Sequence, residues 1–146
     1  MSGTPQRSRP GVSLAAMPVS VAGYSHVTVM VDDLDAALRF YGDVLGFEPI
    51  PRPDGFGPGA WLQAGTAQVH IGVVAEMVKP AGLPHLALFV PADDWDATME
   101  AIEAAGAGFM MGPNRREDFG RTVRAAFVTD PAGNVIELTD VDPART

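Results

Sequence analysis

The chain contains one residue pattern twice, and this internal repeat limits what it can fold into. The first copy, "YSHVTVMVDDLDAALRFY", starts at Tyr24, and the second, "LPHLALFVPADDWDATME", starts at Leu83. In both copies a histidine precedes five mostly apolar residues, an acidic segment and a helix-like pattern. His26 and His85 match at an offset of 59 residues. A repeat of this length predicts two copies of one supersecondary unit.

Apolar residues recur at helical spacing after each acidic segment, which predicts one amphipathic helix per copy. In the first copy, Asp32 or Asp33 is the candidate N-cap and Gly46 the candidate end. In the second copy, Asp93 is the candidate N-cap and Gly106 the candidate end. The two apolar series are Leu34, Ala37, Leu38, Tyr41 and Leu45, and then Trp95, Met99, Ile102 and Ala105.

Three strand-like segments follow each predicted helix. The first copy has "FEPI", a Pro/Gly-rich loop at 51–59, "AWLQAG" and "AQVHIGVV". The second has "GFMMG", a loop expected at 112–121, "TVRAAFVTD" and "NVIELTD". The turn "DPAGN" (130–134) places Pro and Gly where a tight hairpin needs them. Each copy therefore predicts a βαβββ module, and the chain as a whole belongs to the α+β class.

The repeat also predicts the domain organisation. We expect the first module at 23–75, a linker at 76–83 and the second module at 84–142. Residues 1–22 contain three prolines and many small residues, and we interpret them as a disordered N-terminal extension. A signal peptide is the alternative, but Pro18 interrupts a short, weakly apolar stretch that no clean cleavage site follows. We therefore expect a cytoplasmic protein.

Composition argues against nucleic acid and membranes as partners. Ten Lys and Arg residues stand against eighteen Asp and Glu residues, so the formal net charge is -8. Nucleic-acid binding needs a basic face. The chain has one basic cluster, which consists of Arg115, Arg116, Arg121 and Arg124. We interpret this cluster as a solvated face, and contact with an anionic substrate is the alternative. No apolar run approaches the roughly 18 residues of a membrane-spanning helix. The chain has no cysteine, so neither disulfides nor thiolate metal ligands are available.

The three histidines and one glutamate occupy matched positions in the two copies. His26 and His85 open the first strands, and His70 and Glu137 lie at equivalent places in the fourth strands. Alone, each histidine would more often be a core residue, but a carboxylate inside an apolar strand is costly unless a cation pairs with it. Neutral imidazole and carboxylate suit Zn, Ni, Co, Mn or Fe(II). We therefore expect these four residues to bind one divalent metal ion, with positions left open for a substrate.

Strand alternation and loop composition point to further residues near such a metal. Thr28 shares a strand face with His26, and Gln68 shares one with His70. Phe56 and Trp61 belong to the segment "RPDGFGPGAW", which we interpret as a rim that supplies apolar contacts. We expect Thr28, Gln68, Phe56 and Trp61 to bind substrate, with an ordinary barrel-lining role for Gln68 and a core role for Trp61 as alternatives.

Three motifs resemble the vicinal oxygen chelate superfamily, the group of glyoxalases, bleomycin resistance proteins and dioxygenases. They are "HVTVMVDDLDAALRFYGDVLGFE", "PHLALFV" and "FVTDPAGNVIEL", and the resemblance spans residues 24–140. It implies paired βαβββ modules that form an incomplete barrel around a cleft with a divalent metal. In the family, the ligands come from the first and fourth strands of each module, which here are His26, His70, His85 and Glu137. The resemblance also implies a homodimer, and in some relatives modules from two chains build each site.

The resemblance implies a metal-dependent enzyme that chelates a small oxygenated metabolite through two neighbouring oxygens, as a lyase, isomerase or dioxygenase. Glu137 is the implied catalytic base, as in similar glyoxalases, with His70 as the alternative. Two positions depart from glutathione-type glyoxalase I, because Met30 stands where arginine is usual and His70 where glutamate is usual. The reaction type therefore stays open. The alternative is a binding protein of the bleomycin-resistance type, which holds a small molecule without turnover.

Overall fold

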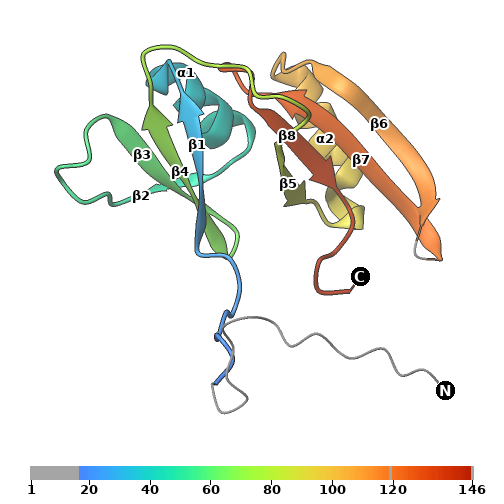
Figure 1. Ribbon diagram of the computed structural model, residues 1–146. Helices are drawn as coiled ribbons and strands as arrows, with labels where there is room; N and C mark the ends of the chain where they lie inside the picture. Colours follow the sequence, from blue (N-terminus) through green and yellow to red (C-terminus); the bar gives the residue numbers. More distant parts are fainter. Residues whose placement is uncertain (1–16, 119, 146) are drawn as a thin grey trace.

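The computed structural model describes residues 17–118 and 120–145, which form two four-stranded sheets with a helical segment on each (Figure 1). The α+β class and the duplicated βαβββ order are confirmed. Of the predicted N-terminal extension, residues 1–16 lie outside the described residues. In chain order, the elements are β1 (His26–Val31), α1 (Leu34–Leu38), η1 (Arg39–Val44), β2 (Glu48–Ile50), β3 (Gly59–Ala64), β4 (Ala67–Val73), β5 (His85–Phe89), η2 (Ala92–Asp94), α2 (Trp95–Ala104), β6 (Phe109–Asp118), β7 (Arg121–Thr129) and β8 (Val135–Thr139).

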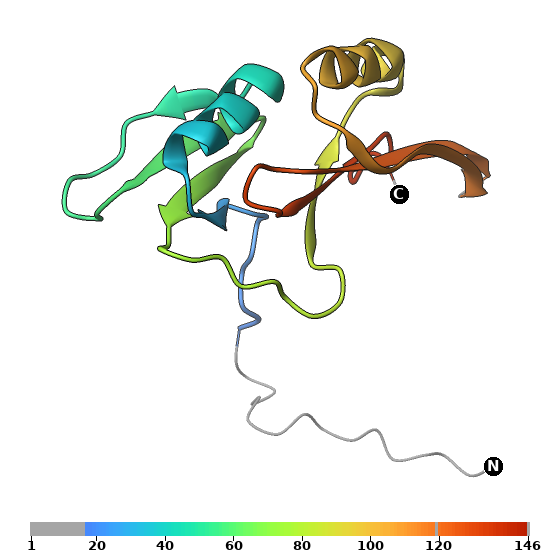
Figure 2. The same cartoon turned by 90° about the horizontal axis from the view of Figure 1, so that it is seen from above.

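The two sheets have the same strand order, β1-β4-β3-β2 in the first unit and β5-β8-β7-β6 in the second. In each, the first strand pairs in parallel with the fourth, and the other pairs are antiparallel. The helical segments of both units lie on the same side of the sheets (Figure 2). Each sheet therefore has a helix-covered face and an opposite face, which we call the open face. The sheets form no closed barrel.

One apolar core runs through both units and lies between the sheets and their helices. In β1, alternate residues point into this core: Val27 and Val29 pack on it, while His26 and Thr28 remain exposed on the open face. Ile102 of α2 is one of its largest fully buried side chains. Within the described ranges, none of the helices has the length and apolar character needed to cross a membrane.

The first helix follows the sequence prediction closely, and the second begins differently. Asp33 caps α1, because its side chain accepts a hydrogen bond from Ala36 N at 3.0 Å. The helix continues as the π-helical η1 and ends before Gly46, whose φ of 75° favours glycine. In the second unit Asp94 is the N-cap, so the prediction of Asp93 is wrong. Asp93 lies inside the preceding 3-10 turn η2.

The segment 112–121 is a strand over most of its length, so its prediction as a loop is wrong. β6 continues to Asp118 and pairs with β7 in one long hairpin. Gly112 and Pro113 lie at an irregularity of the pairing, between Met111 and Asn114. Gly112 has a φ of 79°, and β6 is an edge strand, where proline is tolerated. Glycine and proline therefore mark a β-bulge here instead of a loop.

The turn between β7 and β8 fastens the second unit to the first. The Asp130 side chain, only 2% exposed, accepts hydrogen bonds from Tyr41 Oη at 2.7 Å and from Asn134 Nδ2 at 2.9 Å. Asn134 Nδ2 also donates to the Met30 carbonyl at 2.8 Å. Burial and the neighbouring carboxyl raise the pKa of Tyr41 far above its usual value. The "DPAGN" turn thus closes the hairpin as predicted and also holds β1 and η1 in place.

Candidate metal centre

The four predicted metal ligands lie on the open faces of the two sheets, two on each. His26 and His85 begin β1 and β5, and His70 and Glu137 lie within β4 and β8. His70 pairs in register with Thr28, two residues after the first histidine. Glu137 pairs in the same way with Ala87, two residues after the second. The equivalence inferred from the sequence repeat therefore holds in the strand register.

The two histidines of the first unit form a stack of rings with Trp61. The His26 and His70 ring centroids are 4.0 Å apart, and the planes differ by 12°. Trp61 lies on the other face of His70, at 4.1 Å and 4°. Partial burial, the neighbouring His26 and the Arg52 guanidinium lower the pKa of His70 below its usual value. A lowered pKa favours the neutral ring, which is the form that binds metal ions.

In the second unit, His85 and Glu137 face each other in an arrangement that a proton or a metal ion between them would stabilise. His85 Nδ1 lies 2.8 Å from the Leu83 carbonyl oxygen, which only accepts, so Nδ1 carries a proton. In the neutral ring Nε2 then has a lone pair, and Nε2 lies 3.2 Å from Glu137 Oε2. Two lone pairs at this distance repel unless a proton or a metal ion lies with them. A backbone carbonyl that fixes the second nitrogen is typical of metal-binding histidines, so these donors fit a divalent metal.

The structure brings the four ligands together as two pairs, and the pairs do not meet. His26 contacts His70, and His85 contacts Glu137. Among the residues that the structure describes, no three His, Cys, Asp or Glu side chains are arranged to hold one metal ion. The donor types fit the predicted metal, whereas a complete set of ligands is not assembled within these ranges of one chain.

Three of the four predicted substrate-binding residues lie directly beside His70. Thr28 is its exposed register partner on β1, and Trp61 is its partner on β3. Gln68 Oε1 lies 2.8 Å from His70 Nε2. Because an amide can present either its oxygen or its nitrogen, Gln68 can accept from or donate to this ring. In this structure Gln68 therefore orients His70, and it lines the open face as strand alternation predicts.

The fourth predicted substrate residue, Phe56, lies on the loop between β2 and β3. Phe56 is 62% exposed, and its ring centre is 6.2 Å from that of Trp61. Arg52, a residue that the sequence did not single out, holds this loop. Its guanidinium donates to the Gly57 carbonyl at 2.6 Å and to the Phe56 carbonyl at 3.2 Å, and lies 5.6 Å from the centre of the Phe56 ring. The loop is thus tied together beside the His26–His70 pair.

Sequence reasoning also missed Phe127. This residue pairs in register with Glu137 across β7 and β8, and its ring contacts His85 edge-on at 5.5 Å. The signal was present in the repeat, because Trp61 pairs with His70 just as Phe127 pairs with Glu137. Applying the repeat to the third strands as well as to the first and fourth would have found it.

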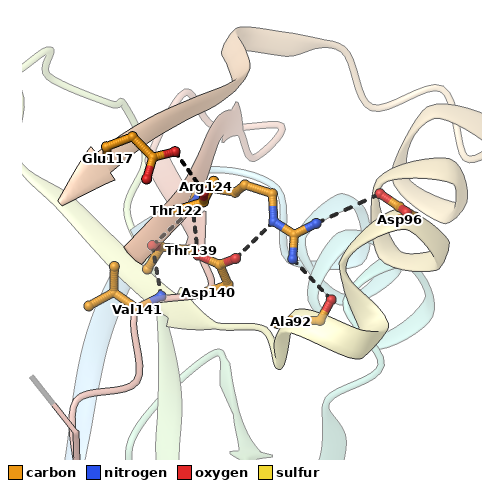
Figure 3. Close-up of polar contacts among 8 residues, drawn as sticks. All are labelled: Ala92, Asp96, Glu117, Thr122, Arg124, Thr139, Asp140 and Val141. Atoms are coloured by element: carbon orange, nitrogen blue, oxygen red, sulfur yellow. Dashed lines mark hydrogen bonds and ion pairs between the residues drawn. The ribbon is translucent and has the colours of Figure 1, made fainter. Parts of the chain in front are cut away.

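Two arginines of the basic cluster, Arg116 and Arg124, have partners within the chain, and Figure 3 shows those of Arg124. Arg124 Nε donates to Asp140 Oδ2 at 2.8 Å, and its Nη2 donates to the Ala92 carbonyl at 3.1 Å. Its guanidinium also lies 5.4 Å from the Trp95 ring. Arg116 forms an ion pair with Asp118 of the same strand. Arg124 therefore stabilises the fold on the helix-covered side, away from both ligand pairs.

Two cavities lie away from the ligand pairs. One, of about 530 Å³, is lined by apolar residues of η1, β5 and α2, among them Val44 and Ile102. The other, of about 540 Å³, lies between α2 and the β6–β7 hairpin and includes Arg115 and Arg124. None of the four predicted ligands lines either cavity. Neither of these two cavities is therefore the candidate metal centre.

Comparison with known proteins gives consistent matches over nearly the same residues. A family model described as the Glyoxalase/Bleomycin resistance protein/Dioxygenase superfamily matches residues 23–138. A protein named Glyoxylase I 4 from Arabidopsis thaliana is 28% identical, over 88% of this chain and 76% of that protein. A probable lactoylglutathione lyase from Vibrio parahaemolyticus is 32% identical, over 77% of this chain and 86% of that protein.

A solved structure shares the fold. The crystal structure of a glyoxalase/dioxygenase from Nostoc punctiforme superposes with a TM-score of 0.71 at 20% identity, over 88% of this chain and 97% of that one. At this identity the likeness concerns the fold, and it confirms the glyoxalase-like arrangement of two βαβββ units.

Proposed function

Because the chain belongs to the Glyoxalase/Bleomycin resistance protein/Dioxygenase superfamily, we propose that it is a divalent-metal-dependent enzyme acting on a small oxygenated metabolite. The reaction is of the lyase, isomerase or dioxygenase type. The names of two relatives, a glyoxylase and a probable lactoylglutathione lyase, support the lyase type among these. His26, His70, His85 and Glu137 are the proposed ligands of one Zn, Ni, Co, Mn or Fe(II) ion.

One observation carries this proposal, namely the contact between His85 and Glu137. The proton on His85 Nδ1 leaves Nε2 aimed at a carboxylate oxygen 3.2 Å away, an arrangement suited to a shared cation. The repeat supplies a second pair of donors on the equivalent strands of the other unit. A divalent ion bound there would polarise the oxygens of a chelating substrate.

Other roles in the reaction are proposed for the following residues of the chain. Glu137 is the proposed proton acceptor, because its carboxylate is partly exposed on the open face and has an oxygen next to His85. Gln68 fixes the orientation of the His70 ring. Thr28 supplies an exposed hydroxyl beside His70, and Phe56 and Trp61 supply apolar contacts with the substrate.

We further propose that two copies of the chain form a homodimer that completes the metal site. Support comes from the separation of the ligand pairs, since no three candidate ligands meet within the described ranges of one chain. The open faces also carry exposed apolar side chains, among them Met30 at 39%, Phe89 at 45% and Met111 at 41%. Burying such side chains against a second copy would stabilise the pair.

Elemental analysis tests the metal site. We expect near-stoichiometric divalent metal in the wild-type protein purified without added metal or chelator. Removing one ligand, in His70→Ala or Glu137→Ala, should weaken metal binding by at least about tenfold. Glu103→Ala, which removes an exposed carboxylate from α2, is the matched control and should keep the metal. Equal metal binding in all four proteins, or none after reconstitution, would favour the alternative of a small-molecule binder without turnover.

A further inference from the structure

Each proposed ligand pair has an aromatic side chain next to it, at the same position in the two units. Trp61 of β3 is the register partner of His70 on β4. Phe127 of β7 is the register partner of Glu137 on β8. Residues that pair directly across neighbouring strands lie on the same face of a sheet. Each open face therefore presents a ligand and, one strand further on, an aromatic ring.

These two rings are not used by the apolar core. Both are partly exposed, and neither belongs to the core cluster or to the apolar residues packed against it. Their chain neighbours Leu62 and Val128 are fully buried members of that cluster. Large aromatic side chains on the open face contribute little to the core burial that stabilises the fold, which leaves them available for contact with a ligand.

Both rings lie close to the ligands. Trp61 stacks flat against His70 with centroids 4.1 Å apart, and Phe127 meets His85 edge-on at 5.5 Å. The apolar surface continues outward on the next strand in both units, and neither of these rows of four residues contains a lysine or an arginine. The rows are Thr28, His70, Trp61 and Ile50, and Ala87, Glu137, Phe127 and Met111.

Arg52, on the loop whose Phe56 ring lies 6.2 Å from the Trp61 ring, already has partners. Its guanidinium donates to two carbonyl oxygens of its own loop and lies over the Phe56 ring. An anionic group on a substrate would meet aromatic and aliphatic surface along these rows. Aromatic faces favour flat rings, which bind in stacked or edge-on geometry.

We propose that Trp61 and Phe127 are specificity-determining residues, and that they select substrates with a flat, uncharged aromatic group beside the two chelating oxygens. This inference rests on the proposed function, because the metal ion fixes where the oxygens lie. It adds the class of substrate, and it assigns to Phe127 a role equivalent to that of Trp61 in the other unit.

Two hydroxamates that differ in one group test this inference. Benzohydroxamate and acetohydroxamate both chelate metals through two neighbouring oxygens, and they carry a phenyl and a methyl group respectively. Their dissociation constants would be measured on the Co²⁺-loaded protein from the visible absorption of Co²⁺, and divided by the values for free Co²⁺. We expect benzohydroxamate to bind about tenfold more tightly after this correction.

Variants then test whether the two rings cause the preference for benzohydroxamate over acetohydroxamate. Trp61→Leu and Phe127→Leu should each reduce it severalfold, while acetohydroxamate binding stays within about twofold of wild type. Val78→Ala is the control, because Val78 is 82% exposed and lies between β4 and β5, outside both sheets. It should keep the full preference.

Each outcome separates this inference from the proposed function. Equal corrected affinities on the wild-type protein, or a preference that both leucine variants retain, would overturn the role of the two rings and leave the metal site standing. Failure to take up Co²⁺, or to bind either hydroxamate, would instead contradict the metal site itself. If a leucine variant does not fold, the ratio of the two corrected affinities on the wild-type protein still tests the preference for an aromatic group.

Discussion

At the scale of single residues, the hydrogen bond from Tyr41 to Asp130 lies almost wholly out of contact with water. Tyr41 is 0% exposed and Asp130 2%, and their oxygens are 2.7 Å apart. We expect Tyr41→Phe to lower the free energy of unfolding by about 1–3 kcal/mol, because it removes a donor from a buried carboxyl. Urea denaturation measures this. Tyr24→Phe is the control, since Tyr24 is 86% exposed, and it should change little.

The raised pKa of Tyr41 predicts a loss of stability in alkali. The folded protein keeps the phenol proton at a pH where the unfolded chain, with a tyrosine pKa of about 10, releases it. Below that pH both states hold the proton, so this residue adds no pH dependence. Above it, the difference in unfolding free energy between wild type and Tyr41→Phe should shrink by about 1.4 kcal/mol per pH unit. A difference that stays constant in denaturation at rising pH would contradict this.

The sequence alone predicts most of the candidate site at this scale, for a physical reason. Strand alternation and the internal repeat depend only on the positions of residues in the sequence. Both single out His26, His70, His85 and Glu137. Phe127 was missed because an aromatic residue in a strand is usual in a core, and its role becomes visible only when the β7–β8 register is known.

At the scale of elements, Arg124 connects the two C-terminal strands to the start of the second helix. It bonds the Asp140 carboxylate, whose side chain is 5% exposed, and the Ala92 carbonyl of η2. Arg124→Met keeps much of the side-chain volume but leaves Asp140 as a nearly buried charge without its cation. We expect it to lower the free energy of unfolding by about 3 kcal/mol. Arg115→Met, at an exposed position of β6, should stay within about 0.5 kcal/mol of wild type in the same assay.

The order of the elements could be predicted because helical and strand periodicity are local properties. Where an element ends depends on partners far along the chain, and there the prediction failed. β6 extends to Asp118 because β7 pairs with it, whereas Gly112 and Pro113 alone indicate a loop. Likewise, Asp93 and Asp94 are chemically equivalent caps, and the 3-10 turn that follows Pro91 determines which one starts α2.

At the scale of the whole molecule, the separation of the two ligand pairs predicts complementation between defective chains. His70→Ala damages the first unit, and Glu137→Ala damages the second. If each site combines the first unit of one chain with the second unit of its partner, a mixed dimer contains one site with both units intact. Refolding the two variants together in equal amounts should then restore about a quarter of the high-affinity metal sites.

The metal content of the refolded mixture measures how many sites are restored. Each variant refolded alone is the control. No restored sites in a mixture that contains mixed dimers would show that each chain builds its own site, and would contradict the shared site. The sequence could not decide between these arrangements, because the repeat gives equivalent positions within a chain and carries no information about which copies of the chain meet.

The parallel pairing of β1 with β4 also affects how the protein folds during synthesis. β1 leaves the ribosome first, and it is an edge strand with β4 as its neighbour, so it has no partner until Ala67–Val73 has been made. The first sheet can then close while the second unit is still being translated. If it closes in that interval, β4 is occupied before β5 emerges. Two strands of such similar pattern are thereby kept from competing for the same partner.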